Sequence, residues 1–276
     1  MGLFYNNNVS GRGVAKKGPK KKPFFRFWEL FANKFWTFFT LNLIYVLFCL
    51  PIVTIGPATA ALTAMMRNIY LERPQFLWHD FVQYFKKNFK QSFFIGIADI
   101  IAVAVCVITF IQFSKLDMNE SSMKVLFVLS IASQVLFLLM NFYIYPQIVA
   151  LDLRISGIIK NSVILIFVNL PAELIVLVFV MGFAALFIYF TLPLVFFLPF
   201  FPGAWLVFLS VFCCYPAIQK LIINPYYENN GEVNPEIPDW ELDDDDGGAL
   251  FEDQGGKEEP IRLKNEKKKG HGKVIK

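Results

Sequence analysis

Acidic side chains are rare inside the apolar runs of this 276-residue chain, so those that occur there are the first candidates for chemistry. Asp99 lies within the apolar run 93–113, where a carboxylate could bind a proton, a cation or a cationic partner. The alternative is a shallow position paired with a Lys or Arg. Glu173 follows Pro171 by two residues. There an acid can serve the same chemistry or complement the dipole of a helix that begins nearby.

Amide side chains form a second set of polar candidates in the apolar runs. This set consists of Asn42, Gln134 and Asn141. Each amide can donate and accept, so we expect these residues to form hydrogen bonds between helices in an apolar environment. If they instead surround a polar cavity with Asp99, they could contact a solute.

The turn motif at residues 51–57 is a third candidate. It contains Pro51, Thr54, Gly56 and Pro57, which interrupt an otherwise apolar stretch. Proline disfavours continuation of a helix, and it suits the first turn of a new one. Backbone groups freed at a helix break line binding sites in transporters. A hairpin turn needs the same residues, and the sequence does not decide between the two.

Catalytic and metal-binding patterns are missing from the sequence. It has no HExxH motif, no P-loop and no Ser/His/Asp arrangement, so an enzyme is the class that we least expect. The four cysteines lie in apolar runs, and the two histidines are far apart at positions 79 and 271. We therefore expect no metal and no other cofactor, and nucleic acid is not an expected partner.

Composition identifies the elements that must position these residues. Hydrophobic residues make up 56% of the chain and aromatic residues 17%, more than a water-soluble domain usually carries. Several apolar runs approach the roughly 20 residues that cross a bilayer. We expect an all-α, polytopic transmembrane bundle of about six spans. The expected spans are 35–52, a short second span 57–70 after the Pro-Gly-Pro hairpin, 93–113, 125–150, 171–190 and 192–215.

Amphipathic segments lie between the expected spans. Residues 24–39 suit an interfacial helix, and residues 74–92 and 156–170 suit cytoplasmic surface helices. Small residues recur every four positions at Gly56, Ala60 and Ala64, which predicts close helix packing by the second span.

Basic residues set the expected topology. Loops placed outside contain only Lys115 and Lys124, whereas loops placed inside contain Arg73, Lys86, Lys87, Lys90, Arg154 and Lys160. The positive-inside bias therefore predicts a protein of the cell membrane with both termini in the cytoplasm. Residues 1–23 and 225–276 are strongly charged. We expect a disordered basic N-terminus, a membrane domain over 24–224 and a disordered tail that is first acidic and then basic.

Three motifs in the first part of the chain resemble the YesL family of bacterial multi-pass membrane proteins, a domain of unknown function. The motifs are Asn42-Leu43, the turn Leu50-Pro51-x-x-Thr54-x-Gly56-Pro57-Ala58, and Asp80-Phe81 followed by Lys87-Asn88-Phe89-Lys90. The likeness covers residues 24–224. It implies a membrane protein often linked to carbohydrate uptake, with no established activity.

Two functions from different classes are consistent with these features. The first is an accessory or scaffold protein, whose partners are the lipid bilayer and other membrane proteins such as sugar-uptake components. The alternative is a small-solute transporter, which requires a polar cavity around Asp99, Gln134 and Asn141. The scarcity of charge inside the apolar runs favours the first.

Overall fold

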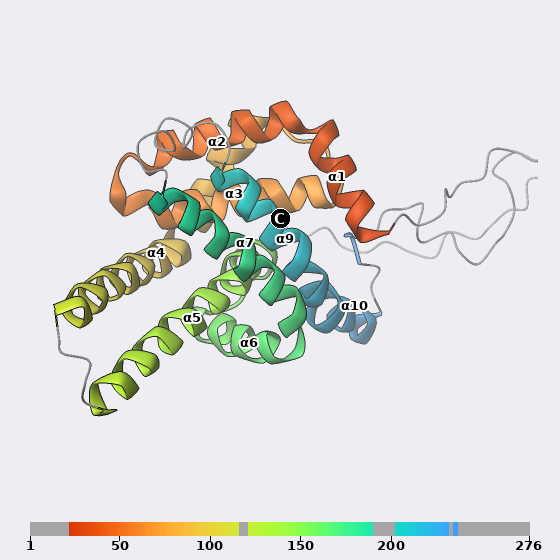
Figure 1. The fold of residues 1–276 in the computed structure, drawn as a ribbon. Coiled ribbons are helices and arrows are strands. Elements are labelled where there is room, and N and C mark those ends of the chain that lie inside the picture. Colours follow the sequence, from red (N-terminus) through yellow and green to blue (C-terminus); the bar gives the residue numbers. More distant parts are fainter. Residues whose placement is uncertain (1–21, 116–120, 190–201, 232–233, 237–276) are drawn as a thin grey trace, which may run out of the picture. The chain divides into compact units, whose positions relative to one another are not determined.

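The computed structural model describes residues 22–115, 121–189, 202–231 and 234–236. Over these residues all regular structure is helical, which confirms the all-α class (Figure 1). The helices are α1 (Pro23–Asn33), α2 (Phe35–Cys49), η1 (Ile52–Thr54), α3 (Ile55–Tyr70), α4 (Leu77–Lys115), α5 (Ser121–Ala150), α6 (Ile155–Val168), α7 (Leu170–Tyr189), α9 (Pro202–Ile218), η2 (Gln219–Ile223) and α10 (Asn224–Asn230).

Helices α2 and α3 are joined by a tight turn at Pro51. The proline ends α2, and the single turn η1 leads directly into α3, which carries Pro57 in its first turn. At its other end α3 returns to α1, because Arg26 Nη2 donates a hydrogen bond to the carbonyl of Tyr70 at 3.0 Å. The segment 35–70 is therefore a helical hairpin.

Helix α3 forms the centre of the bundle. All of its residues are buried except Ile55, Thr59 and Arg67, and it contacts α2, α4, α5 and α9. Alanine and glycine let neighbouring backbones come close. The closest approach is to α4, where Gly56 faces Gly96. The small residues of α3 thus pack helices together, as their spacing predicts.

Helix α4 differs from the sequence prediction. A surface helix at 74–92 and a separate span at 93–113 were expected, but Leu77–Lys115 is one continuous helix. No proline or glycine interrupts residues 77–95, and Gly96 is accommodated by the crossing with α3. At 1.5 Å per residue its length is about 58 Å. This exceeds the roughly 30 Å hydrocarbon core of a bilayer.

Two sharp bends separate pairs of helices. Helices α1 and α2 meet at 72°, and α6 and α7 meet at 96°. At the second bend Asn169 donates to the hydroxyl of Tyr143 on α5 at 3.0 Å and to the carbonyl of Cys213 on α9 at 3.4 Å. The bend is thereby fixed to two neighbouring helices.

Among the described residues, three helical stretches are long and apolar enough to cross a membrane, and the number rises to five if each bent pair is one span. The three are 77–113, 124–150 and 203–230. Helix α3, with 16 residues, is not among them. The chain therefore has the helices of a membrane protein, whereas a count of six depends on α3.

The C-terminal helices extend beyond the expected end of the membrane domain. The predicted sixth span starts outside the described residues and was expected to end near 215, but helix continues through η2 and α10 to Asn230. The π-turn η2 follows Pro216 of α9 and leads directly into α10. The expected boundary at 224 thus falls inside helical structure. Most of the two charged termini lies outside the described residues.

Candidate functional site

Asp99 lies between α4 and α5 and is held by two neutral side chains. Asn141 Nδ2 donates to Asp99 Oδ1 at 2.8 Å, and the Tyr145 hydroxyl donates to Asp99 Oδ2 at 2.5 Å. No Lys or Arg in the described part of the chain pairs with Asp99, in contrast to the expected alternative. The carboxylate therefore accepts interhelical hydrogen bonds, and both of its partners come from one face of α5.

A cavity of about 170 Å³ borders this centre. Thr59, Asn141, Tyr145 and Ser210 contribute polar side chains to its wall, and the remaining lining is mostly apolar. Asn141 Oδ1 is buried and has no hydrogen-bond partner among the described residues. Pockets for drug-sized ligands usually measure about 300–1,000 Å³. This cavity is therefore suited to water or a very small solute.

Asn42 caps the start of another helix. It is fully buried in α2, and its Oδ1 accepts a hydrogen bond from the backbone N–H of Ala204 at 3.0 Å. Ala204 is the third residue of α9, whose first amides have no partner within the helix. Asn42 thus satisfies a buried amide across a helix interface. Gln134, in contrast, is half-buried on α5 and makes no side-chain hydrogen bond to any described residue.

Glu173 is a fully buried carboxylate in the first turn of α7. Neither of its carboxylate oxygens has a hydrogen-bond partner in the described part of the chain. The Tyr143 hydroxyl accepts a hydrogen bond from Asn169 and is a polar neighbour of the Glu173 carboxylate, to which it makes no hydrogen bond. The location fits the predicted favourable interaction with the helix dipole. The capping hydrogen bond that would accompany it is not made.

The turn motif of residues 51–57 is closed by its own threonine. Thr54 Oγ1 lies 2.7 Å from the carbonyl oxygen of Phe48 and 2.6 Å from that of Pro51. The hydroxyl therefore satisfies carbonyls that the end of α2 leaves without a helical partner. Gly56 permits the contact with α4. The residues of the turn motif therefore form a hairpin turn between α2 and α3.

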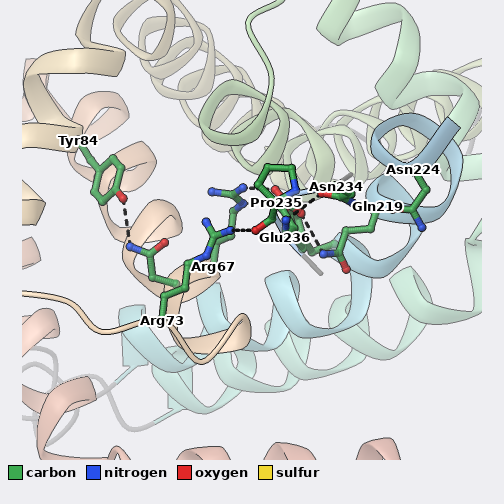
Figure 2. A network of polar contacts seen from close by, with 10 residues as sticks. Arg67, Arg73, Tyr84, Gln219, Asn224, Asn234, Pro235 and Glu236 are labelled. Carbon is green, nitrogen blue, oxygen red and sulfur yellow. Dashed lines mark hydrogen bonds and ion pairs between the residues drawn. The ribbon is translucent and has the colours of Figure 1, made fainter. Parts of the chain in front are cut away.

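A second polar centre joins the end of α3 to the C-terminal segment 234–236 (Figure 2). Its central residues are Arg67 on α3 and Glu236, whose side chains form an ion pair and are only 12% and 6% exposed. Both oxygens of Glu236 also accept from the Tyr215 hydroxyl, at 2.7 and 2.8 Å. Gln219 Nε2 donates to the second oxygen at 2.9 Å.

Arg67 is bound by Tyr215 as well as by Glu236. Its Nε donates to the tyrosine hydroxyl at 2.5 Å, and its guanidinium carbon lies 5.3 Å from the centre of the same ring. A guanidinium over an aromatic face is stabilised by the ring quadrupole. Tyr215 on α9 thus positions the guanidinium of Arg67, which forms the ion pair with the Glu236 carboxylate.

Two further contacts fix the segment next to Glu236. Arg73 Nη2 donates to the carbonyl of Pro235 at 2.7 Å, and Asn234 Nδ2 donates to Asn224 Oδ1 at 2.8 Å. The backbone N–H of Glu236 donates to Asn234 Oδ1 at 2.9 Å. Each of the three residues therefore takes part in at least one polar contact, as Figure 2 shows.

This second centre was not predicted from the sequence. Arg67 is not among the loop charges that set the expected topology, and Glu236 falls in the tail 225–276 that was expected to be disordered. A signal was available, because an arginine in a helix made mostly of small and apolar residues requires a buried partner. Glu236 also stands apart from the aspartate run, between two prolines. Nothing in the sequence pairs the two.

Comparison with known proteins yields one match. A family model described as "Protein of unknown function, DUF624" matches residues 38–112, which extend from α2 through α3 into α4. No curated protein and no solved structure matches the chain. The match confirms a domain of unknown function in the part of the chain where the sequence motifs lie. The name YesL stays a prediction.

Proposed function

We propose that this chain is a multi-pass protein of the cell membrane that acts as an accessory or scaffold protein for other membrane proteins, and that it is not an enzyme. The observation that carries the proposal is the use of its intramembrane polar groups. Asn141 and Tyr145 both donate to Asp99, and Asn42 caps α9. Groups engaged in holding helices together are not free to bind a solute.

Apolar surface on α4 and α5 supports the same proposal. The C-terminal part of α4 and the N-terminal part of α5 extend away from the other helices (Figure 1). Many of their large apolar side chains are exposed, including Val103, Phe110, Val125 and Leu129. Such a surface suits lipid and the apolar helices of partner proteins. The association with sugar-uptake components rests on the resemblance to the YesL family alone.

The proposed topology has six spans and both termini in the cytoplasm. It is supported by contacts that bring both ends of the bundle to the loop after α3. Arg26, near the N-terminus, bonds to Glu72 at 3.3 Å, and Arg73 bonds to Pro235 near the C-terminal end. The two ends of the described helical bundle meet at this loop and are therefore proposed to lie on one side of the membrane. The basic residues of early α4 belong to that side as well.

A labelling experiment tests this topology. Val53→Cys and Gln83→Cys are placed separately in a protein whose four native cysteines are replaced, since both positions are exposed. In intact cells we expect an impermeant thiol reagent to label position 53, and position 83 to react only after permeabilisation. Labelling of position 83 alone, or of both positions, in intact cells would contradict the topology.

The alternative function is transport of a small solute or cation. It is favoured by the cavity beside Asp99 and by the unbonded Oδ1 of Asn141. Coupled transport needs an acid that changes charge during the cycle, and Asp99 is bonded to two residues of the cavity wall, Asn141 and Tyr145.

Uptake into liposomes decides between the two functions. The parent protein and Asp99→Asn are reconstituted and supplied with radiolabelled sugars and monovalent cations. We expect neither protein to exceed empty liposomes, and Asp99→Asn to keep its melting temperature within a few degrees, because an amide still bonds to Asn141 and Tyr145. Uptake by the parent protein that the folded Asp99→Asn variant lacks would overturn the accessory function.

A further inference from the structure

The contacts around Glu236 have the form of a ligand in a binding site. One carboxylate receives donors from three side chains on three helical elements, Arg67 on α3, Tyr215 on α9 and Gln219 at the start of η2. The segment 234–236 that carries it is not part of any helix. Arginine with a second donor on the other oxygen is a common way for proteins to bind a carboxylate.

The charge of Arg67 still requires an anionic partner when the segment 234–236 detaches. The Arg67 side chain is only 12% exposed, and its guanidinium lies over the ring of Tyr215. A buried charge that loses its partner is strongly unfavourable. Departure of Glu236 would therefore leave a preformed site that recruits another carboxylate. The adjoining π-turn η2, which supplies Gln219, is a rare geometry that occurs frequently at functional sites.

The segment itself is held by polar contacts. Asn234, Pro235 and Glu236 are each bonded through a side chain or a carbonyl. In water a hydrogen bond between protein groups replaces one with solvent, so its net gain is comparable with the cost of ordering the residues that make it. The ion pair with Arg67 favours the attached state, and because the segment has only three residues and no helical structure, it can detach and rebind as a unit.

We propose that Arg67, Tyr215 and Gln219 form a carboxylate receptor for an Asn-Pro-Glu segment, and that residues 234–236 occupy it as a reversible intramolecular latch. In the closed state the latch links α3 to the C-terminal segment, from which forty residues follow to the end of the chain. In the open state the receptor binds a glutamate of another acidic peptide. This inference does not depend on whether the protein is an accessory protein or a transporter.

Hydrogen exchange of the full-length protein in detergent tests the latch. We expect Glu236→Gln and Arg67→Gln each to increase the exchange rate of the amide of Glu236 and its immediate neighbours at least tenfold. The control Glu228→Gln removes the same charge from an exposed position on α10 and should leave that rate unchanged. Exchange in α5, which does not touch the segment, reports whether each variant is folded. Unchanged exchange at residue 236 in a folded Glu236→Gln protein would overturn the latch.

Peptide binding tests whether the receptor accepts a carboxylate from outside. A fluorescent peptide with the sequence of residues 232–239, EVNPEIPD, is added to full-length Glu236→Gln protein, and its anisotropy is measured. We expect it to bind at least tenfold more tightly than EVNPQIPD, and to bind the parent protein weakly because the tethered segment competes at a high effective concentration. In the double variant Glu236→Gln/Arg67→Gln, the two peptides should bind with the same affinity. Equal binding of the two peptides to Glu236→Gln would show that no carboxylate receptor exists.

Discussion

Gly56→Ala and Gly96→Ala are each expected to lower the melting temperature of the purified protein by several degrees. A Cβ atom on Gly56 would lie 2.2 Å from the carbonyl oxygen of Ser92 and 2.7 Å from the Cα atom of Gly96. A Cβ atom on Gly96 would lie 2.6 Å from the Cα atom of Gly56. All of these are backbone atoms, so no side-chain rotation relieves the overlap. Helices α3 and α4 must move apart, and overpacking of this kind costs about 1–3 kcal/mol.

Gly182→Ala is the matched control for these substitutions. Gly182 lies inside α7, and apart from its chain neighbours and the adjacent turns of its own helix backbone, no described heavy atom is within 4 Å of the position that its Cβ would take. Alanine is favoured over glycine inside a helix by roughly 0.5–1 kcal/mol. In thermal unfolding in detergent, the melting temperature of Gly182→Ala should therefore equal or exceed that of the parent protein. If Gly56→Ala also unfolds with the parent protein, α3 and α4 do not cross at these glycines.

The sequence was most informative where one local signal decides the structure. Proline at 51 and the Gly56-Pro57 pair mark the break between α2 and α3, and small residues at helical spacing mark α3 as a packing helix. Residues 156–170 and 171–190 were placed on different elements because Pro171 separates them, and the structure has α6 and α7 there. In each case the information lies within a few residues.

Features that depend on tertiary context were not predicted. The continuity of α4 could not be inferred, because the change from an amphipathic to an apolar pattern near Phe93 resembles a boundary although nothing there breaks the helix. The partners of Asp99 are 42 and 46 residues away in the sequence, and Glu236 is 169 residues from Arg67. Such pairings follow from the way the helices pack, which no local pattern encodes.

Glu173→Leu is expected to raise the melting temperature, the opposite of the effect at the glycines. The carboxylate is fully buried, and both of its oxygens lack hydrogen-bond partners among the described residues. A buried polar group in that state costs about 1–3 kcal/mol. The favourable interaction of an acid with the α7 dipole is worth about 0.3–1 kcal/mol in exposed cases. Since the first effect is the larger, removal of the carboxylate should be a net gain.

The control for this substitution is Glu228→Gln, which removes an acid from an exposed position and should change stability by no more than about 0.5 kcal/mol. A lower melting temperature for Glu173→Leu would mean that the interaction of the carboxylate with the helix dipole, or with an additional partner, outweighs the cost of burying it. Glu173 would then be a residue that stabilises the fold. A higher melting temperature would identify Glu173 as an acid that the fold does not require. Residues that serve activity often lower the stability of the fold. Glu173 would then take precedence over Asp99, whose hydrogen bonds connect α4 to α5, as the acid to vary in the liposome uptake assay.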